Sequence, residues 1–296
     1  MPLGTVAIVL VAAIAHAAWN LASTYKRGST LLFVGAYTSV SALLCLPLAV
    51  VATATGAQPL TGQLAGASVV SAVLHAAYSL TLQTGYDRAE LGVVYPVARG
   101  TGPLLTMVVA VLVLAERPSW LALAGALAVV AGIVVVTGNP TRNRGPHPLR
   151  GVLWGAATGA TIAAYTLWDA YAIGRLGLAP ISYYTGTLLA QSLILAPGLV
   201  RALPRGRGLS RARGELVAAV RLDRVPILVV AVLSPLAYVL VLTALQTAPV
   251  ALVAPLREAS IVIGSLLAWR FLGEGDLARR VVGAVVVLVG IVAIGV

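Results

Sequence analysis

Residues 31–54 read LLFVGAYTSVSALLCLPLAVVATA and contain no charged side chain. An α-helix needs about 20 consecutive apolar residues to cross the roughly 30 Å hydrocarbon core of a bilayer, so this stretch is long enough to span a membrane. Runs of similar length recur along all 296 residues, of which 59% are hydrophobic and only 10% are charged. Soluble domains carry about 25% charged residues. The sequence therefore predicts an all-α, polytopic integral membrane protein.

Ten apolar runs predict ten transmembrane helices. We expect them at residues 3–24, 29–53, 62–84, 90–114, 118–138, 150–174, 179–200, 224–246, 249–270 and 278–296. The first run ends in Ala-His-Ala, like a signal-peptide cleavage site, but no basic residue precedes it. We therefore interpret it as a retained helix. The single cysteine, Cys45, lies in an apolar run and excludes a disulfide framework.

The first and last five helices share motifs in the same order. The matching pairs are HAAWN at 16–20 with YTLWD at 165–169, VYPVAR at 94–99 with VAPLRE at 253–258, LAE at 114–116 with LGE at 272–274, and the glycines 125 and 132 with 283 and 290. Residues 1–138 and 150–296 are thus predicted repeats, joined by a basic loop at 139–149. An odd number of helices in each repeat inverts the second one, as in many secondary transporters.

The charge of the chain, +11, is concentrated in short connections between apolar runs. This placement is typical of topogenic charge and argues against nucleic-acid binding. Most of the 20 Lys and Arg residues lie at the connections between helices 1 and 2, 3 and 4, 5 and 6, 7 and 8, and 9 and 10. The positive-inside rule then places these connections in the cytoplasm and both termini outside the cytoplasmic membrane.

Three motifs resemble those of the drug/metabolite transporter superfamily, specifically its EamA-type members: HAAWN at 16–20, YPVARG at 95–100 and APLRE at 254–258. The resemblance implies secondary transport of a small metabolite or drug through a central cavity. It also implies that helices 1, 3, 4, 6, 8 and 9 line the cavity and that helices 5 and 10 are peripheral. Many members have cytoplasmic termini, which differs from the orientation that the charges predict here.

Arg99 and Glu258 are predicted to reach the middle of the bilayer, at equivalent positions of the two repeats. Ionisable side chains at this depth usually face a water-filled cavity or a partner. One interpretation is a split site, in which Arg99 binds an anionic group and Glu258 binds a cationic group or a proton. The alternative is a structural ion pair of Glu258 with Arg99 or with Arg257.

His16 and His75 lie at equal depths in helices 1 and 3, within similar motifs. Because histidine titrates near physiological pH, both are candidates for proton coupling, together with Glu258. The alternative is that each histidine is a packing residue with satisfied hydrogen bonds.

Further candidate substrate-binding residues are aromatic or polar side chains near these positions: Tyr95, Trp19, Asn20, Tyr78, Trp168, Asp169, Tyr165 and Arg257, with Tyr238 as a weaker candidate. The two tryptophans could equally belong to the interfacial aromatic belt, and Asp169 could simply reach water. Pro96 and Pro255 each remove a backbone donor and are candidate hinges. Glycines at 125, 132, 151, 155, 159, 283 and 290 predict close helix packing.

The sequence contains no Walker loop, enzyme motif or His/Cys metal cluster. We therefore expect no catalytic activity, cofactor or metal, and transport driven by a gradient. The leading hypothesis is alternating-access transport of a small, zwitterionic, amino-acid-like metabolite, with proton coupling, by a monomer or homodimer in the bilayer. The alternatives are efflux of cationic aromatic drugs, a lipid-modifying membrane enzyme that uses His16 and His75, and a non-transporting scaffold or receptor.

Overall fold

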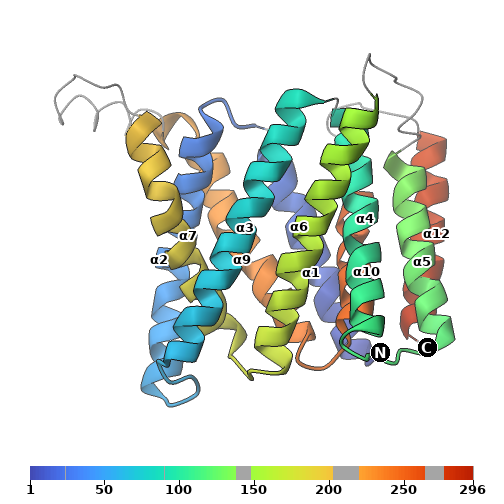
Figure 1. Cartoon of the computed structure of the whole chain (residues 1–296), viewed down its shortest axis with the longest axis horizontal. Helices are drawn as coiled ribbons and strands as arrows, with labels where there is room; N and C mark the ends of the chain where they lie inside the picture. The colour runs from blue at the N-terminus through green and yellow to red at the C-terminus, as the bar shows by residue number, and fades with distance from the viewer. Residues whose placement is uncertain (24, 90, 138–147, 203–219, 264–276, 296) are drawn as a thin grey trace.

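The computed structural model describes residues 1–23, 25–89, 91–137, 148–202, 220–263 and 277–295. Within these ranges the regular structure is entirely α-helical. The helices are α1 (Leu3–Ser23), α2 (Thr30–Ala54), α3 (Gly62–Arg88), α4 (Leu91–Leu112), α5 (Trp120–Thr137), α6 (Pro148–Gly174), α7 (Pro180–Ala202), α9 (Arg224–Ala244), α10 (Val250–Arg257) and α12 (Leu277–Gly295) (Figure 1). They follow the predicted apolar runs closely, apart from α3 and the ninth run.

The helices begin and end at residues with identifiable local roles. The Thr61 side chain accepts a hydrogen bond from the backbone N–H of Leu64 and caps the first turn of α3. Proline occupies the first position of α6 and of α7, where its missing N–H costs no intrahelical bond. Gly177, in the turn before α7, has a φ of +66°, which glycine adopts without steric cost.

The ninth predicted helix, 249–270, is wrong as a continuous element. The helix α10 ends at Arg257, and Glu258 lies in a turn with φ −71° and ψ −5°. Residues 259–263 are helical again, and the rest of the predicted run lies outside the described residues. Pro255 has no N–H to donate to the preceding turn. The Glu258 N–H bonds the Pro255 carbonyl, three residues back, where an α-helical N–H bonds the carbonyl four residues back. The break therefore falls beside two charged residues.

The helices form one bundle in which neighbours along the chain run in opposite directions (Figure 1). Both termini lie on one face, and α1 and α6 run in opposite directions. Close packing joins α1 to α9, α2 to α7, α3 to α6, α4 to both α6 and α10, and α5 to α12. Helices of the first half thus pack mainly against helices of the second half, and the two halves share one core.

Small residues allow this packing, as the sequence predicts. A Cβ atom on Gly125 of α5 would lie 2.6 Å from the carbonyl oxygen of Gly290 on α12, and one on Gly132 would lie 2.8 Å from that of Gly283. On α6, a Cβ atom on Gly155 would lie 2.6 Å from the Cβ of Val97. Without glycine at these positions the backbones could not approach so closely.

The outer surface of the bundle is apolar. Leu43 and Leu48 of α2, Val73 of α3 and Leu228 of α9 are all more than half exposed. Among the described residues, α1, α2, residues 62–82 of α3 and α9 are each long and apolar enough to cross a membrane, and α4, α5 and α12 contain shorter apolar helices. The exterior is suited to lipid rather than to water.

Two carboxylates tie distant segments together at the ends of helices. The Glu116 side chain follows α4 and accepts hydrogen bonds from the backbone N–H groups of Val250 and Ala251, both at 2.9 Å. These N–H groups belong to the first turn of α10, where a negative charge is favourable. On the opposite face, Asp223 accepts from the N–H groups of Arg27 and Gly28 at 2.8 and 2.9 Å.

Candidate functional site

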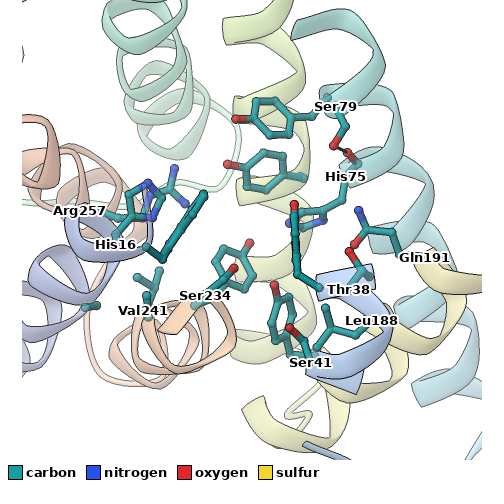
Figure 2. Close-up of a pocket in the computed structure, with 18 of the residues that line it drawn as sticks. His16, Thr38, Ser41, His75, Ser79, Leu188, Gln191, Ser234, Val241 and Arg257 are labelled. Carbon is teal, nitrogen blue, oxygen red and sulfur yellow. Dashed lines mark hydrogen bonds between the residues drawn. The ribbon is translucent and has the colours of Figure 1, made fainter. Parts of the chain in front are cut away.

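A cavity of about 120 Å³ lies inside the bundle (Figure 2). Its described lining residues come from α1, α2, α3, α4, α6, α7, α9 and α10, whereas α5 and α12 contribute none of them. The resemblance implied a lining from six helices only. That expectation is incomplete, because α2 contributes Tyr37, Thr38 and Ser41, and α7 contributes Tyr184, Leu188 and Gln191.

One end of the cavity carries a buried cluster of three charges. The Glu258 carboxylate accepts from Nη1 of Arg99 at 3.0 Å through Oε2, and from Nη2 and Nε of Arg257 at 3.0 and 3.2 Å through Oε1. The side chains of Arg99, Arg257 and Glu258 are only 11%, 6% and 2% exposed. Both alternative pairs considered from the sequence are therefore present together, and the cluster has a net charge of +1.

The cluster is accessible from the cavity through its arginines. Arg99 and Arg257 are both among the lining residues, whereas Glu258 is not. Arg257 is the last residue of α10 and Glu258 follows in the turn, so the helix break brings their side chains to the same place. The carboxylate thus lies behind the two guanidinium groups as seen from the cavity.

Aromatic rings form much of the remaining wall. The ring of Tyr165 stacks on His75 with centroids 4.2 Å apart, and Tyr78 meets Tyr165 edge-on at 5.5 Å. Tyr238 contacts both His75 and Tyr184, with centroid distances of 5.5 and 4.8 Å. The Arg257 guanidinium lies 5.9 Å from the centroid of the Tyr165 ring, a cation–π distance. These rings connect the charged cluster to His75.

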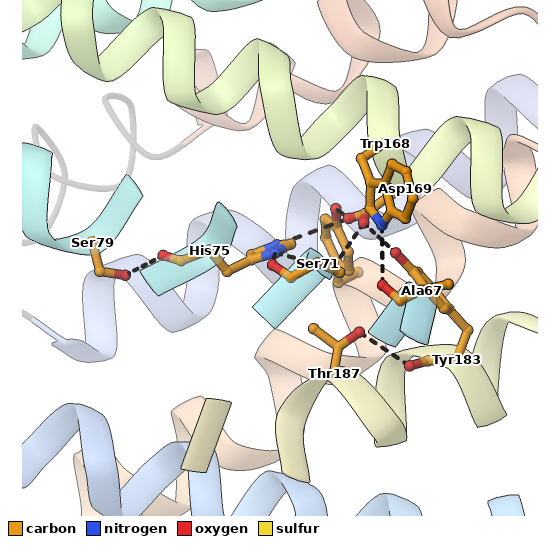
Figure 3. Close-up of polar contacts among 9 residues, drawn as sticks. Ala67, Ser71, His75, Ser79, Trp168, Asp169, Tyr183 and Thr187 are labelled. Atoms are coloured by element: carbon orange, nitrogen blue, oxygen red, sulfur yellow. Dashed lines mark hydrogen bonds and ion pairs between the residues drawn. The ribbon is translucent and has the colours of Figure 1, made fainter. Parts of the chain in front are cut away.

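Asp169 lies behind His75 and is completely buried (Figure 3). Its Oδ1 accepts from the hydroxyl groups of Ser71 and Tyr183 at 2.7 and 2.6 Å, and its Oδ2 accepts from the hydroxyl of Tyr238. The idea that Asp169 simply reaches water is therefore wrong. Helices α3, α7 and α9 each supply a hydroxyl group that replaces the water.

His75 is held in one tautomer by its neighbours. Its Nδ1 lies 2.9 Å from the Ser71 carbonyl oxygen, which can only accept, so Nδ1 carries a proton. Nε2 lies 3.9 Å from Oδ2 of Asp169. Nε2 therefore faces a carboxylate. The side chain also lines the cavity.

The other predicted residues divide into two groups. Trp19, His16, Tyr78 and Tyr165 line the cavity along with the two arginines and His75. Asn20, Trp168, Asp169 and Pro255 are not among its described lining residues. The Asn20 amide bonds the His16 carbonyl in its own helix, and Trp168 donates to the Ala67 carbonyl at 3.0 Å. The side chains of Tyr95 and Pro96 lie outside the described residues.

Trp19 has an unusual environment. Its ring meets His16 edge-on with centroids 4.8 Å apart. The indole Nε1 is buried and has no hydrogen-bond partner among the residues that the structure describes. A buried N–H group without an acceptor costs about 1–3 kcal/mol, and this one belongs to a residue that lines the cavity.

The lining residues of α2 and α7 were not predicted from the sequence. Tyr37, Thr38 and Ser41 have the spacing of a single helical face, and Gln191 is an isolated amide in an apolar run. Polar side chains in the two predicted helices were the available signal, but Ser39 of α2 and Ser192 of α7 are not among the described lining residues, so polarity alone does not define the cavity face. Tyr238, a weaker candidate in the sequence, turns out to bind Asp169 and to line the cavity.

Comparisons with known proteins agree with this architecture. A solved protein crystal structure is similar over 99% of this chain and 96% of its own, with a TM-score of 0.76 and 15% sequence identity. At that identity the likeness shows the fold alone. No curated protein matches the chain. The model of the EamA-like transporter family matches residues 149–296, which is half of the sequence. The chain therefore belongs to the EamA-like transporter family of the drug/metabolite transporter superfamily and is a multi-pass membrane protein.

Proposed function

We propose that the protein is a secondary transporter that moves a small metabolite across the cytoplasmic membrane by alternating access. The observation that carries the proposal is the central cavity, which helices of both halves enclose and which meets buried charges where α10 ends. Transporters of inverted-repeat architecture bind their substrates at such interrupted helices near the middle of the bilayer.

The packing pattern supports an inverted repeat of residues 1–138 and 150–296. In such a repeat α1 corresponds to α6, α2 to α7, α3 to α9, α4 to α10 and α5 to α12. The contacts occur in matching pairs: α1 packs on α9 as α6 packs on α3, and α4 packs on α6 as α10 packs on α1. Such symmetry lets one half rock against the other around a fixed site.

The cavity has the size of a small metabolite. A cavity needs about 10–15 Å³ to hold one water molecule, so 120 Å³ is room for a small organic solute. Amino acids and small aromatic acids belong to this size class. The guanidinium groups of Arg99 and Arg257 offer a binding site for the carboxylate that both classes share.

A proton gradient is the proposed energy source. The candidates His16 and His75 line the cavity, and Glu258 lies directly behind its arginines. Among them, His75 has the geometry of a proton carrier, because Nε2 faces the carboxylate of Asp169. We further propose that the face bearing Lys26, Arg27 and Arg88 is cytoplasmic, with both termini outside.

The test is solute counterflow in vesicles that contain the purified protein. Vesicles preloaded with unlabelled phenylalanine or phenylpropionate should accumulate the labelled compound transiently, and vesicles containing the Arg257→Gln variant should not. A ligand that stabilises the purified protein but is not moved would indicate a receptor or scaffold. Conversion of vesicle lipids would indicate an enzyme.

A further inference from the structure

We infer that the protein binds an anionic phospholipid in a groove on the face of the bundle opposite its two termini (Figure 1). The groove has a volume of about 360 Å³ and lies where the end of α1, the connection between α1 and α2, and the start of α9 meet. It shares none of its described lining residues with the central cavity. The inference goes beyond the proposed transport function and does not depend on it.

Three guanidinium groups border the groove. Arg27 comes from the connection between α1 and α2, whereas Arg221 and Arg224 flank the turn at Asp223 that precedes α9. All three residues are exposed, and the described lining of the groove contains no carboxylate. Arginine often binds a phosphate group through two parallel N–H donors. A phosphodiester is therefore an anion that this set of side chains suits.

Asp223 positions these arginines without facing the groove. It is 2% exposed and is not among the described lining residues. Its two carboxylate oxygens accept from the backbone N–H groups of Arg27 and Gly28 at 2.8 and 2.9 Å. This contact holds Arg27, from the first half of the chain, beside Arg221 and Arg224 from the second half. Three arginines and one carboxylate leave a net charge of +2, which attracts an anion.

The remaining lining residues favour a lipid over a free phosphate ion. Apart from the arginines and Tyr25, those that the structure describes are apolar: Ala22, Leu222, Val225, Pro226 and Val229. Val225, Leu228 and Val232 of α9 are 61%, 55% and 51% exposed. Residues three and four positions apart share one face of a helix, so these three form an apolar stripe that leads away from the groove. Acyl chains can cover such a stripe, whereas a phosphate ion gains nothing from it.

The position of the groove suits a phospholipid headgroup. Helices α1, α2 and α9 are each long and apolar enough to cross a membrane, and the groove lies at their ends on one face. Arg224 is the first residue of α9, so its charge stands where the apolar span begins. Tyr25 is 55% exposed and lines the groove, as expected of an aromatic side chain at the membrane–water interface. In the proposed orientation this is the cytoplasmic leaflet, whose anionic lipids attract basic segments.

A purely topogenic role of the same arginines makes a different prediction. The positive-inside rule requires charge at this face but no particular shape. Any exposed arginine on the face would then attract anionic lipid to the same extent. The groove predicts instead that binding depends on these three arginines and on the space beside them.

The experiment measures lipid binding to the purified, delipidated protein in an uncharged detergent by native mass spectrometry. The probes are dioleoylphosphatidylglycerol, dioleoylphosphatidylcholine with the same acyl chains, and glycerol 3-phosphate without acyl chains. The phosphatidylglycerol should bind roughly tenfold or more tightly than either of the others. Equal affinity for the two lipids would overturn the inference. Equal affinity for glycerol 3-phosphate would also overturn it, because the site would then take a soluble phosphate compound.

A charge variant tests the arginines. Arg224→Gln should weaken binding of the phosphatidylglycerol roughly fivefold, the contribution of one basic residue near an anionic membrane surface. The matched control is Arg150→Gln, because Arg150 is also exposed near the start of a helix on the same face but does not line the groove. Equal weakening by both variants would leave only the general attraction of a basic face and would overturn the site.

A shape variant leaves every arginine in place, so it remains decisive if Arg224→Gln alters insertion into the membrane. In Val225→Trp the indole ring occupies part of the groove and should weaken binding of the phosphatidylglycerol at least as much as Arg224→Gln does. Leu228→Trp is the matched control, because Leu228 is similarly exposed on α9 but is not among the described lining residues. Unchanged binding in Val225→Trp, or equal loss in Leu228→Trp, would overturn the inference.

Discussion

The charged cluster makes a quantitative prediction about stability, in which Glu258 matters more than either arginine. Glu258 is 1% exposed and accepts hydrogen bonds from both guanidinium groups. The variant Glu258→Gln removes the carboxylate that both guanidinium groups bind, and removing one partner from a buried ion pair typically costs about 3–5 kcal/mol. Arg99→Gln removes one charge-assisted hydrogen bond, worth about 1.5–3 kcal/mol, and leaves Arg257 and Glu258 as a neutral pair.

The expected order of stability is therefore wild type, Arg99→Gln, Arg257→Gln and then Glu258→Gln. Arg257 ranks below Arg99 because it donates two hydrogen bonds to Glu258 where Arg99 donates one. The free energies of unfolding of Arg99→Gln and Glu258→Gln should differ by about 2 kcal/mol, which corresponds to roughly 4–8 °C in melting temperature for a chain of this size.

The assay is thermal denaturation in detergent. The measured quantity is the fraction of protein that remains monodisperse in gel filtration after heating. The double variant Arg99→Gln/Glu258→Gln should recover part of the loss of Glu258→Gln, because it removes one of the two buried guanidinium groups that lose this carboxylate. A Glu258→Gln variant as stable as Arg99→Gln, or no recovery in the double variant, would refute the three-charge cluster.

Three further predictions concern the proton carrier, the helix packing and the orientation. Asp169→Asn keeps the shape of the network in Figure 3 but removes its charge. The pH dependence of solute flux should flatten while counterflow persists. An unchanged pH profile would exclude Asp169 from proton coupling. Gly132→Val places a Cβ atom 2.8 Å from a carbonyl oxygen of α12 and should lower the melting temperature by several degrees. The control Gly66→Val has open space around its Cβ and should not lower it. Equal effects of the two variants would contradict the close packing. A cysteine replacing exposed Arg175 should react with impermeant thiol reagents outside intact cells, and one replacing Tyr25 should not, because the Tyr25 face is the cytoplasmic one in the proposed orientation. Native Cys45 is buried and should give no background labelling. The reverse pattern would invert the orientation.

The helices and their approximate ends follow from the sequence because helix formation is local. Each backbone hydrogen bond joins residues four apart, and the length of an apolar run decides whether a helix spans the bilayer. The same local reasoning identified Arg99, Glu258, His16 and His75, since an ionisable residue in an apolar run is conspicuous. The glycines of α5, α6 and α12 were predicted for the same reason.

The partners of these residues were decided by the tertiary structure. The sequence offered Arg99 or Arg257 as the partner of Glu258, and the fold uses both because α10 stops at Arg257. The sequence left open that Asp169 reaches water, and in the fold Asp169 accepts hydrogen bonds from hydroxyl groups of three other helices. Contacts between residues up to 159 positions apart depend on how each helix is rotated about its axis.

That rotation is poorly encoded in a membrane protein, for a physical reason. Lipid tails are as apolar as a leucine side chain, so the face of a helix that meets lipid resembles the face that meets the core. In α2 the buried Ala42 and the exposed Leu43 are both apolar, and only the polar Tyr37, Thr38 and Ser41 mark the cavity side. The sequence by itself determined that the chain is a multi-pass membrane protein and which ionisable residues lie in its apolar runs. Only the tertiary packing of the eight helices that supply the described lining residues decided which side chains meet in the cavity.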